Sequence, residues 1–146
     1  MSFRVVRRAQ ASWQGTLPEG SGRIVLGSGA FDGPYSLRAR VEDGEHATNP
    51  EELLGAAEAG CFTMSLANLL TEAGLPALEL RTTAEVTLAA AGGGFDITRV
   101  ALTAVGRVPG IDRASFADLA GQAKNCTISR ALGGTEITLE ASLAAG

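Results

Sequence analysis

Three short segments near the start of the chain are rich in residues that favour β-strands, which predicts three strands there. These segments are residues 3–13, 23–26 and 35–41. Turns that contain Gly and Pro separate them, which predicts an antiparallel meander. In the third segment the odd-numbered residues from Leu37 onward are apolar. We therefore expect Arg38 and Arg40 to lie together on its other face.

The pattern then changes to one that predicts a long helix. Asn49 is a favourable N-cap, Pro50 suits the first helical position, and Glu52 at the third position completes a capping box. We expect this helix to run to about Gly74, where Gly and Pro stop it. Between residues 53 and 70 only four side chains are polar, so apolar surface covers nearly the whole circumference. A chain of 146 residues covers such a helix poorly by itself, and we expect a dimer that shares it.

The second half of the chain predicts a hairpin, a helix and a last strand. The expected elements are strands at 78–88 and 95–108 around a glycine turn at 92–94, a helix that follows Pro109 and Gly110 and ends near Cys126, and a strand at 137–143. Leu78 begins the inward-facing set of the first of these strands. The alternation weakens near Arg99, which either a β-bulge or cover on both faces of the strand would explain. The order of strands, helix, hairpin, helix and strand predicts an α+β fold with an antiparallel sheet.

Length and composition fit one folded domain that spans residues 1–146. Apolar residues make up 45% and charged residues 19%, a balance typical of globular proteins. The net charge is −4 and no segment gathers basic residues, so we do not expect nucleic acid as a partner. Charges interrupt the first residues, and no run of about 18 apolar residues occurs. These features predict a cytoplasmic protein that has no membrane partner.

The residues that could carry chemistry are few. His46 is the only histidine and lies in a polar loop, which gives a Ser-His-Asp or Cys-His mechanism little support. Cys61 and Cys126 are far apart in the sequence and, with one histidine, make a poor ligand set, so we expect no metal. No glycine-rich loop has the Lys and the helix that phosphate binding needs, and we expect no cofactor. The two thiols remain.

Each thiol has a structural interpretation and a reactive one. Free cysteine is among the most often buried residue types, so either thiol could pack as a small hydrophobe. Cys61 lies about three turns into its helix, too deep for the helix dipole to stabilise a thiolate, so a reactive Cys61 needs a nearby cation. Eleven of the twelve basic side chains are arginines, which favours an arginine. Cys126 lies at the expected end of a helix, where the dipole disfavours an anion, and suits a resolving thiol better than an attacking one.

Two neighbouring runs in the long helix are specific enough to indicate a family. The run TNPEELLGAA at 48–57, followed by AGCF at 59–62, resembles the signature helix of the OsmC and Ohr peroxidases. Matching segments along the rest of the chain are ASWQG at 11–15, PY at 34–35, VPGID at 108–112 and AKNC at 123–126. The resemblance therefore extends over nearly the whole length.

The resemblance implies an OsmC-like α+β fold, in which antiparallel sheets pack around long central helices in an intertwined homodimer. It also implies a peroxiredoxin-like hydroperoxide reductase of the oxidative or osmotic stress response. Such an enzyme prefers organic hydroperoxides to hydrogen peroxide, forms a disulfide between two cysteines and is recycled by a dithiol reductant. The family's peroxidatic Cys, resolving Cys, Arg and Glu correspond to Cys61, Cys126, Arg40 and Glu51.

The resemblance leaves the surroundings of the attacking sulfur open. Arg38 and Arg23 compete with Arg40 for the role of the activating cation. Glu58 stands one turn before Cys61, and an ionised carboxylate at that place would oppose thiolate formation. This glutamate is the clearest departure from the family pattern.

Glu51 and Cys61 lie too far apart along the predicted helix to contact each other if that helix is unbroken. Glu51 and Cys61 are ten positions apart, about 15 Å along one unbroken helix. Either the helix breaks, at Gly55 or Gly60, or the partner subunit supplies the glutamate. Two other functions of the same fold also stay open: a dimer that binds a hydrophobic ligand, and a redox sensor that turns over no peroxide.

Overall fold

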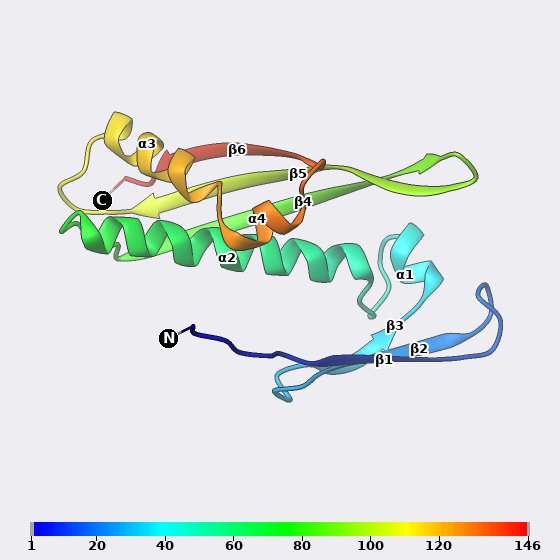
Figure 1. Ribbon diagram of the computed structural model, residues 1–146. Coiled ribbons are helices and arrows are strands. Elements are labelled where there is room, and N and C mark those ends of the chain that lie inside the picture. Colours follow the sequence, from blue (N-terminus) through cyan, green and yellow to red (C-terminus); the bar gives the residue numbers. More distant parts are fainter. Residues whose placement is uncertain (1, 146) are drawn as a thin grey trace. The chain divides into compact units, whose positions relative to one another are not determined.

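Figure 1 shows the computed structural model, which describes residues 2–145. Within this range the chain forms six strands in two three-stranded sheets, together with four helices. The α+β fold class expected from the sequence is thereby confirmed. The chain divides into two compact units, with the boundary between Leu53 and Leu54.

The first unit is built on the expected meander. Its strands, in the order β1-β2-β3, are β1 (Ala9–Gln14), β2 (Ser21–Leu26) and β3 (Asp32–Tyr35), and both pairings are antiparallel. Trp13, Gly22 and Tyr35 stand opposite one another across the three strands. The Trp13 and Tyr35 rings meet edge to face at 5.5 Å, and a Cβ on Gly22 would lie 2.3 Å from the Tyr35 ring. Glycine at this point therefore lets the two rings pack together.

The segment after β3 is a helix, and the prediction of a strand over 35–41 was wrong beyond Tyr35. Helix α1 covers Leu37–Val41, and the hydroxyl of its N-cap Ser36 accepts a hydrogen bond from the Ala39 amide at 3.0 Å. Because residues two apart in a helix point to different sides, Arg38 and Arg40 do not share a face. A five-residue alternation fits a strand and a single capped helical turn almost equally well.

Helix α2 (Pro50–Glu72) confirms the predicted long helix. The Asn49 side chain caps it by accepting a hydrogen bond from the Glu52 amide at 2.8 Å. The Glu52 carboxylate does not complete a capping box; it accepts a hydrogen bond from the Thr48 hydroxyl at 2.8 Å. The helix ends just before Gly74, whose φ of 75° suits glycine. It is continuous, so the alternative of a break within the helix is wrong.

The second unit contains a long hairpin and one more strand. Strands β4 (Glu79–Ala91) and β5 (Gly94–Arg107) pair antiparallel, with a bulge at Thr87 opposite Arg99, close to where the sequence indicated one. Leu78 lies just before β4 and is 72% exposed, so the inward position predicted for it was wrong. The backbone amide of Leu78 donates a hydrogen bond to the Arg107 carbonyl at the open end of the hairpin.

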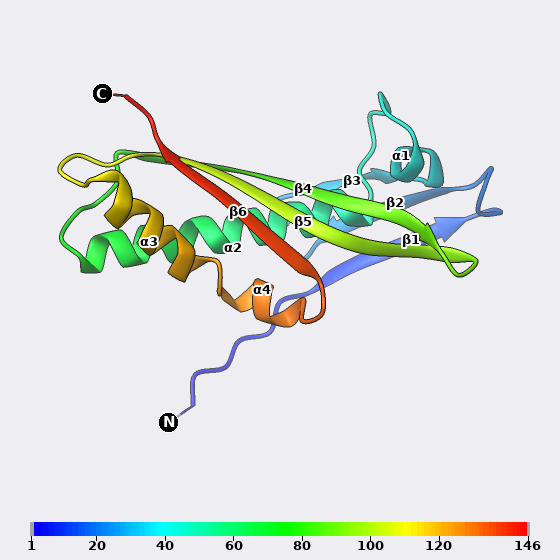
Figure 2. The same cartoon turned by 90° about the horizontal axis from the view of Figure 1, so that it is seen from above.

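Strand β6 (Glu136–Leu143) runs parallel to β5, which corrects the expectation of a purely antiparallel sheet. Figure 2 shows the reason: the chain leaves β5, passes through α3 (Arg113–Ala123) and α4 (Thr127–Ala131), and returns in the same direction. Such a crossover is what a parallel pair requires. The sequence predicted α3 but not α4, which has only five residues.

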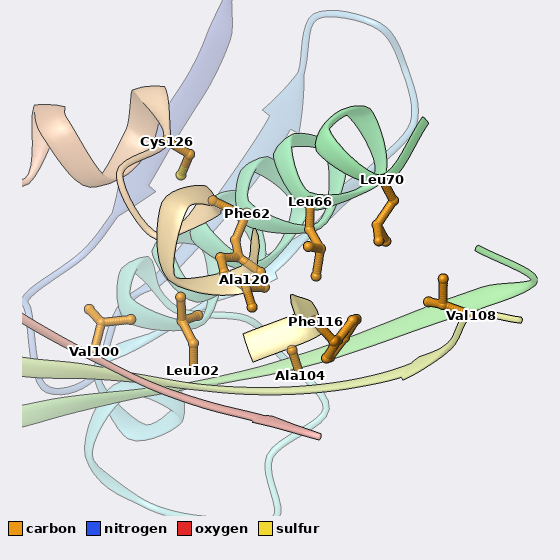
Figure 3. Packing of buried hydrophobic residues seen from close by; sticks show 11 residues of the cluster. Phe62, Leu66, Leu70, Val100, Leu102, Ala104, Val108, Phe116, Ala120 and Cys126 are labelled. Atoms are coloured by element: carbon orange, nitrogen blue, oxygen red, sulfur yellow. The ribbon is translucent and has the colours of Figure 1, made fainter. Parts of the chain in front are cut away.

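The core of the second unit lies between the helices and β5. Figure 3 shows side chains from α2, α3 and β5 meeting there. The largest fully buried apolar side chains are Phe62, Leu66, Leu70, Val100, Leu102 and Phe116. Gly106 of β5 makes room for Phe116, because a Cβ at this glycine would lie 2.7 Å from the ring. In α3, Phe116, Ala120 and Ala123 are buried and Leu119 is half-buried, which is the spacing of one helical face.

Only one face of α2 is covered by the chain itself. The helix is long and apolar enough to cross a membrane, a property it shares with core helices of soluble proteins, yet only 28% of its most apolar stretch is buried. Ala56, Ala57, Gly60 and Met64 form an exposed face, and Met64 is 76% exposed. The prediction of a helix that is apolar all round is correct, and the chain leaves one side of it uncovered.

Candidate active site

The two cysteines line one open pocket of the second unit. The pocket has a volume of about 340 Å³, and its lining residues are Cys61, Met64, Ser65, Asn125, Cys126, Thr127 and Arg130. Cys61, on α2, is half-buried, and Cys126, between α3 and α4, is buried. Both are free thiols. The fold thus brings together two cysteines that lie far apart in the sequence, which is the minimum requirement for a reactive pair.

Cys126 is the more shielded thiol, with 5% of its surface exposed. Its Sγ lies 3.3 Å from the Ser129 Oγ and 3.7 Å from the Glu58 Oε1. Burial raises the pKa of the Cys126 thiol above its ordinary value of 9.0. Hydrogen bonds from Ser129 act against this rise in pKa, whereas the contact with Cys61 and the charge of Glu58 add to it. A thiol in these surroundings stays protonated until something takes its proton.

The sequence predicted that Cys126 lies at the end of a helix, but in the structure Cys126 also begins the next helix. Helix α3 ends at Ala123, and Cys126 is the N-cap of the next helix, α4. The local backbone dipole therefore does not oppose an anion there in the way that a helix C-terminus would. Burial accounts for the protonated thiol instead.

Glu58 is fully buried on α2 and faces Cys126. Its Oε1 accepts hydrogen bonds from the Ser129 hydroxyl and the Cys126 thiol. Its Oε2 has no hydrogen-bond partner among residues 2–145. The sequence singled out Glu58 as a charge that would oppose Cys61, but its hydrogen bonds go to the other thiol. Ser129 was missed altogether; its position three residues after the N-cap of a helix is the only local signal for its role.

The arginine and glutamate implied by the family resemblance meet in the first unit. The Nε of Arg40 lies 2.6 Å from the Oε1 of Glu51, in a salt bridge whose side chains are 35% and 9% exposed. The amide of the Asn49 side chain donates to the Ala39 carbonyl at 2.8 Å, which joins α1 to the start of α2. Because Arg40 belongs to α1 and Glu51 to α2, this hydrogen bond helps to hold the salt bridge in place.

The two competing arginines take part in exposed surface pairs. Arg38 contacts Glu42 at 3.2 Å and Glu45 at 3.4 Å, and its side chain is 69% exposed. Arg23 contacts Asp32 at 2.6 Å, with both side chains at least half exposed. Of the three candidates, Arg40 alone pairs with a buried carboxylate. This contrast favours Arg40 as the functional cation.

Other kinds of site find little support. His46 is exposed on the loop before α2. Within the described part of the chain, no three His, Cys, Asp or Glu side chains are grouped so that they could hold a metal ion. The chemistry open to the site is that of its two thiols and the ionisable groups beside them.

Comparison with known proteins identifies the family of this chain. Residues 42–142 match the family model described as OsmC-like protein. Peroxiredoxin OsmC of Escherichia coli (strain K12) is 42% identical over 139 residues, which cover 94% of this chain and 96% of that protein. The chain therefore belongs to the OsmC-like family, and the resemblance noted in its sequence is confirmed.

Solved structures show the same fold. The organic hydroperoxide resistance protein OhrB of Bacillus subtilis is 25% identical, with a TM-score of 0.68 over 94% of this chain and 98% of that one. The organic hydroperoxide resistance protein OsmC of Legionella pneumophila is 24% identical, with a TM-score of 0.71 over 97% of this chain and 100% of that one. These similarities confirm the OsmC-like fold.

Proposed function

We propose that this chain is a thiol-dependent peroxidase that reduces organic hydroperoxides, and hydrogen peroxide less well, in a cytoplasmic stress response. The single observation that carries this function is that Cys61 and Cys126 line one open pocket. The relative named Peroxiredoxin OsmC and the neighbour named for organic hydroperoxide resistance support the same reaction class. Met64, which lines the pocket, gives an alkyl group an apolar surface to contact.

The proposed cycle starts at the more exposed sulfur. The Cys61 thiolate attacks the terminal oxygen of the hydroperoxide, the O–O bond breaks, and the departing alkoxide takes up a proton to leave as an alcohol. Cys61 is then a sulfenic acid. The Cys126 sulfur attacks it, the S–O bond breaks, and water leaves as the disulfide forms. A dithiol reductant returns both cysteines to thiols and is itself oxidised to a disulfide.

In this proposal Arg40 stabilises both the Cys61 thiolate and the charge that develops on the alkoxide. Glu51 holds the guanidinium in position through the observed salt bridge. About 15 Å of continuous helix separates Glu51 from Cys61, so the pair that serves one sulfur comes from the partner subunit. Residues 1–146 then act as one functional domain within a homodimer.

The second copy would cover the exposed face of α2. This face is made of Ala56, Ala57, Gly60 and Met64, and small side chains allow two helices to approach closely. Two copies of α2 packed antiparallel would bring Glu51 of the partner subunit toward Cys61. Both the uncovered helix and the proposed chemistry support a dimer.

One experiment tests the proposed function. Reduced protein is mixed with cumene hydroperoxide and a dithiol, and peroxide loss is followed for the wild type, Cys61→Ser and Cys126→Ser. We expect steady turnover by the wild type, none above background with Cys61→Ser, and a single stoichiometric oxidation with Cys126→Ser. Stoichiometric oxidation of the wild type without turnover would indicate a redox sensor instead. Thiols that stay reduced would indicate a ligand-binding protein.

A further inference from the structure

The proposed cycle does not use Glu58, although this residue lies beside a reacting atom. Its side chain is fully buried, and burying a carboxyl group is costly unless hydrogen bonds or charges compensate. One oxygen accepts from the Ser129 hydroxyl and the Cys126 thiol, and the other has no partner within residues 2–145. A structural role alone would favour an amide or an apolar side chain here. An acid in contact with a thiol suggests proton transfer.

The second step of the cycle needs such a transfer. A thiolate is the nucleophile in disulfide formation, and a neutral thiol is a poor one. Cys126 is buried, and burial disfavours its ionised form. The leaving group also needs a proton transfer, because hydroxide leaves sulfur readily only when it receives a proton. Attack by Cys126 on an oxidised Cys61 therefore needs a base and an acid in turn.

We propose that Glu58 is a catalytic residue of the resolving step, acting as the base for Cys126 and then as the acid for the departing hydroxide. This inference rests on the proposed function. The Glu58 carboxylate takes the proton of the Cys126 thiol through their existing hydrogen bond as the sulfur attacks the Cys61 sulfenic acid. The S–S bond forms and the S–O bond breaks. The same proton passes to the leaving hydroxide, so one water is released and the carboxylate is restored.

The neighbouring groups fit this assignment. Ser129 donates to the same oxygen that accepts from Cys126 and so fixes the carboxylate against the sulfur. The other titratable or charged side chains around the pocket are Cys61, the reaction partner, and Arg130, which is exposed and donates to the Asn125 carbonyl at 2.7 Å. Among these groups, Glu58 is the only one placed to accept the proton of Cys126.

The test separates the two chemical steps. Reduced protein receives one equivalent of cumene hydroperoxide without a dithiol, and peroxide loss and disulfide formation are timed by stopped flow and acid quench. In E58Q, which keeps the shape and an acceptor oxygen but cannot carry the proton, we expect disulfide formation to slow roughly 10²-fold. Peroxide loss should change by less than about twofold, since it precedes the proton transfer. The Cys61 sulfenic acid should then accumulate and be trapped by dimedone.

The pH profile distinguishes a base from a structural residue. Wild-type disulfide formation should be nearly independent of pH between 6 and 8, whereas in E58Q it should rise about tenfold per pH unit until Cys126 ionises. E58D retains an acid and should keep the flat profile at a reduced rate. Glu72→Gln, an exposed change on the same helix, is the matched control and should behave as the wild type.

Two results would overturn the assignment. One is disulfide formation in E58Q at the wild-type rate and with the wild-type pH profile. The other is a rate of disulfide formation in the wild type that rises tenfold per pH unit. This second result can be obtained even if no variant folds. Failure of the proposed function looks different: no peroxide would be lost and no Cys61 oxidised in any of the proteins, and the role of Glu58 would then fall with it.

Discussion

The two thiols differ most in how much water reaches them. Cys61 is half-buried at the pocket, while Cys126 is 5% exposed and hydrogen-bonded to Ser129 and Glu58. An attacking sulfur must meet an external hydroperoxide, and a resolving sulfur needs only to meet its neighbour. This difference in exposure supports the proposal of the first role for Cys61 and the second for Cys126. Burial protects the resolving thiol from direct oxidation until it is needed.

The raised pKa of Cys126 has a consequence for stability. Its pKa is higher in the folded protein than the ordinary 9.0, so above that pH the folded state binds more protons than the unfolded state. The free energy of unfolding contributed by this group is fully present below pH 9.0 and is lost as the pH rises toward the folded pKa. Urea denaturation of the reduced protein should show this loss as the pH rises above 9.0. In Cys126→Ser the decline should be shallower; equal declines would contradict the assignment.

At the scale of single residues the sequence supplies candidates but not their contacts. Cys61, Cys126, Arg40 and Glu51 could be named from motifs, and Glu58 stood out as a departure. The hydrogen bond between Glu58 and Cys126 joins residues 68 positions apart, which no local pattern can reveal. This hydrogen bond forms because α2 packs against the segment that leads into α4.

At the scale of elements, prediction succeeded where a pattern was long. The 23 residues of α2 and the long strands of the hairpin contain enough periods to be recognised. The two five-residue helices do not: α1 was taken for a strand and α4 was missed. The direction of β6 also escaped prediction, because alternation along one strand does not tell which way its neighbour runs.

The junction between α1 and α2 depends on Asn49, which makes two separable hydrogen bonds. Its oxygen caps α2 and its amide donates to the Ala39 carbonyl. Asn49→Ala should lower the free energy of unfolding by about 1–3 kcal/mol, since it removes the cap and leaves a backbone acceptor unpaired. It should also slow peroxide loss, because α1 carries Arg40.

Asn49→Asp is the matched variant for this prediction, because it keeps the capping oxygen but cannot donate. It should retain most of the stability in urea denaturation and share the loss of peroxidase rate. If both variants reduce cumene hydroperoxide as fast as the wild type, the joint between α1 and α2 does not position Arg40.

The contact between β5 and α3 depends on the absence of a side chain at Gly106. Gly106→Ala would place a methyl group 2.7 Å from the Phe116 ring and should cost about 1–3 kcal/mol of stability. Gly121→Ala on α3 is the control, because no heavy atom lies within 4 Å of a Cβ there. It should raise stability by about 0.5–1 kcal/mol through helix propensity. Thermal unfolding measures both, and equal effects would refute the packing argument.

At the scale of the whole molecule, the chain is α+β and OsmC-like, as the sequence predicted, but it leaves helix α2 partly uncovered. The exposed face of α2 and the helical distance between Glu51 and Cys61 lead to the same requirement for a second copy. The distance could be expected from the sequence positions, whereas the exposed face is known only from which side of α2 the chain itself covers. We therefore propose that the active site is shared between two protomers.

Heterodimers test the shared site most directly. Arg40→Ala and Cys61→Ser protomers carry different tags, are produced together, and are purified so that every dimer contains one of each. The Arg40→Ala protomer keeps Cys61, and the Cys61→Ser protomer keeps Arg40. If Arg40 acts on the Cys61 of the other protomer, these two residues form one complete site in each dimer. We expect about half the wild-type rate of cumene hydroperoxide reduction, against near zero for either homodimer. Heterodimers as inactive as the two homodimers would contradict the account.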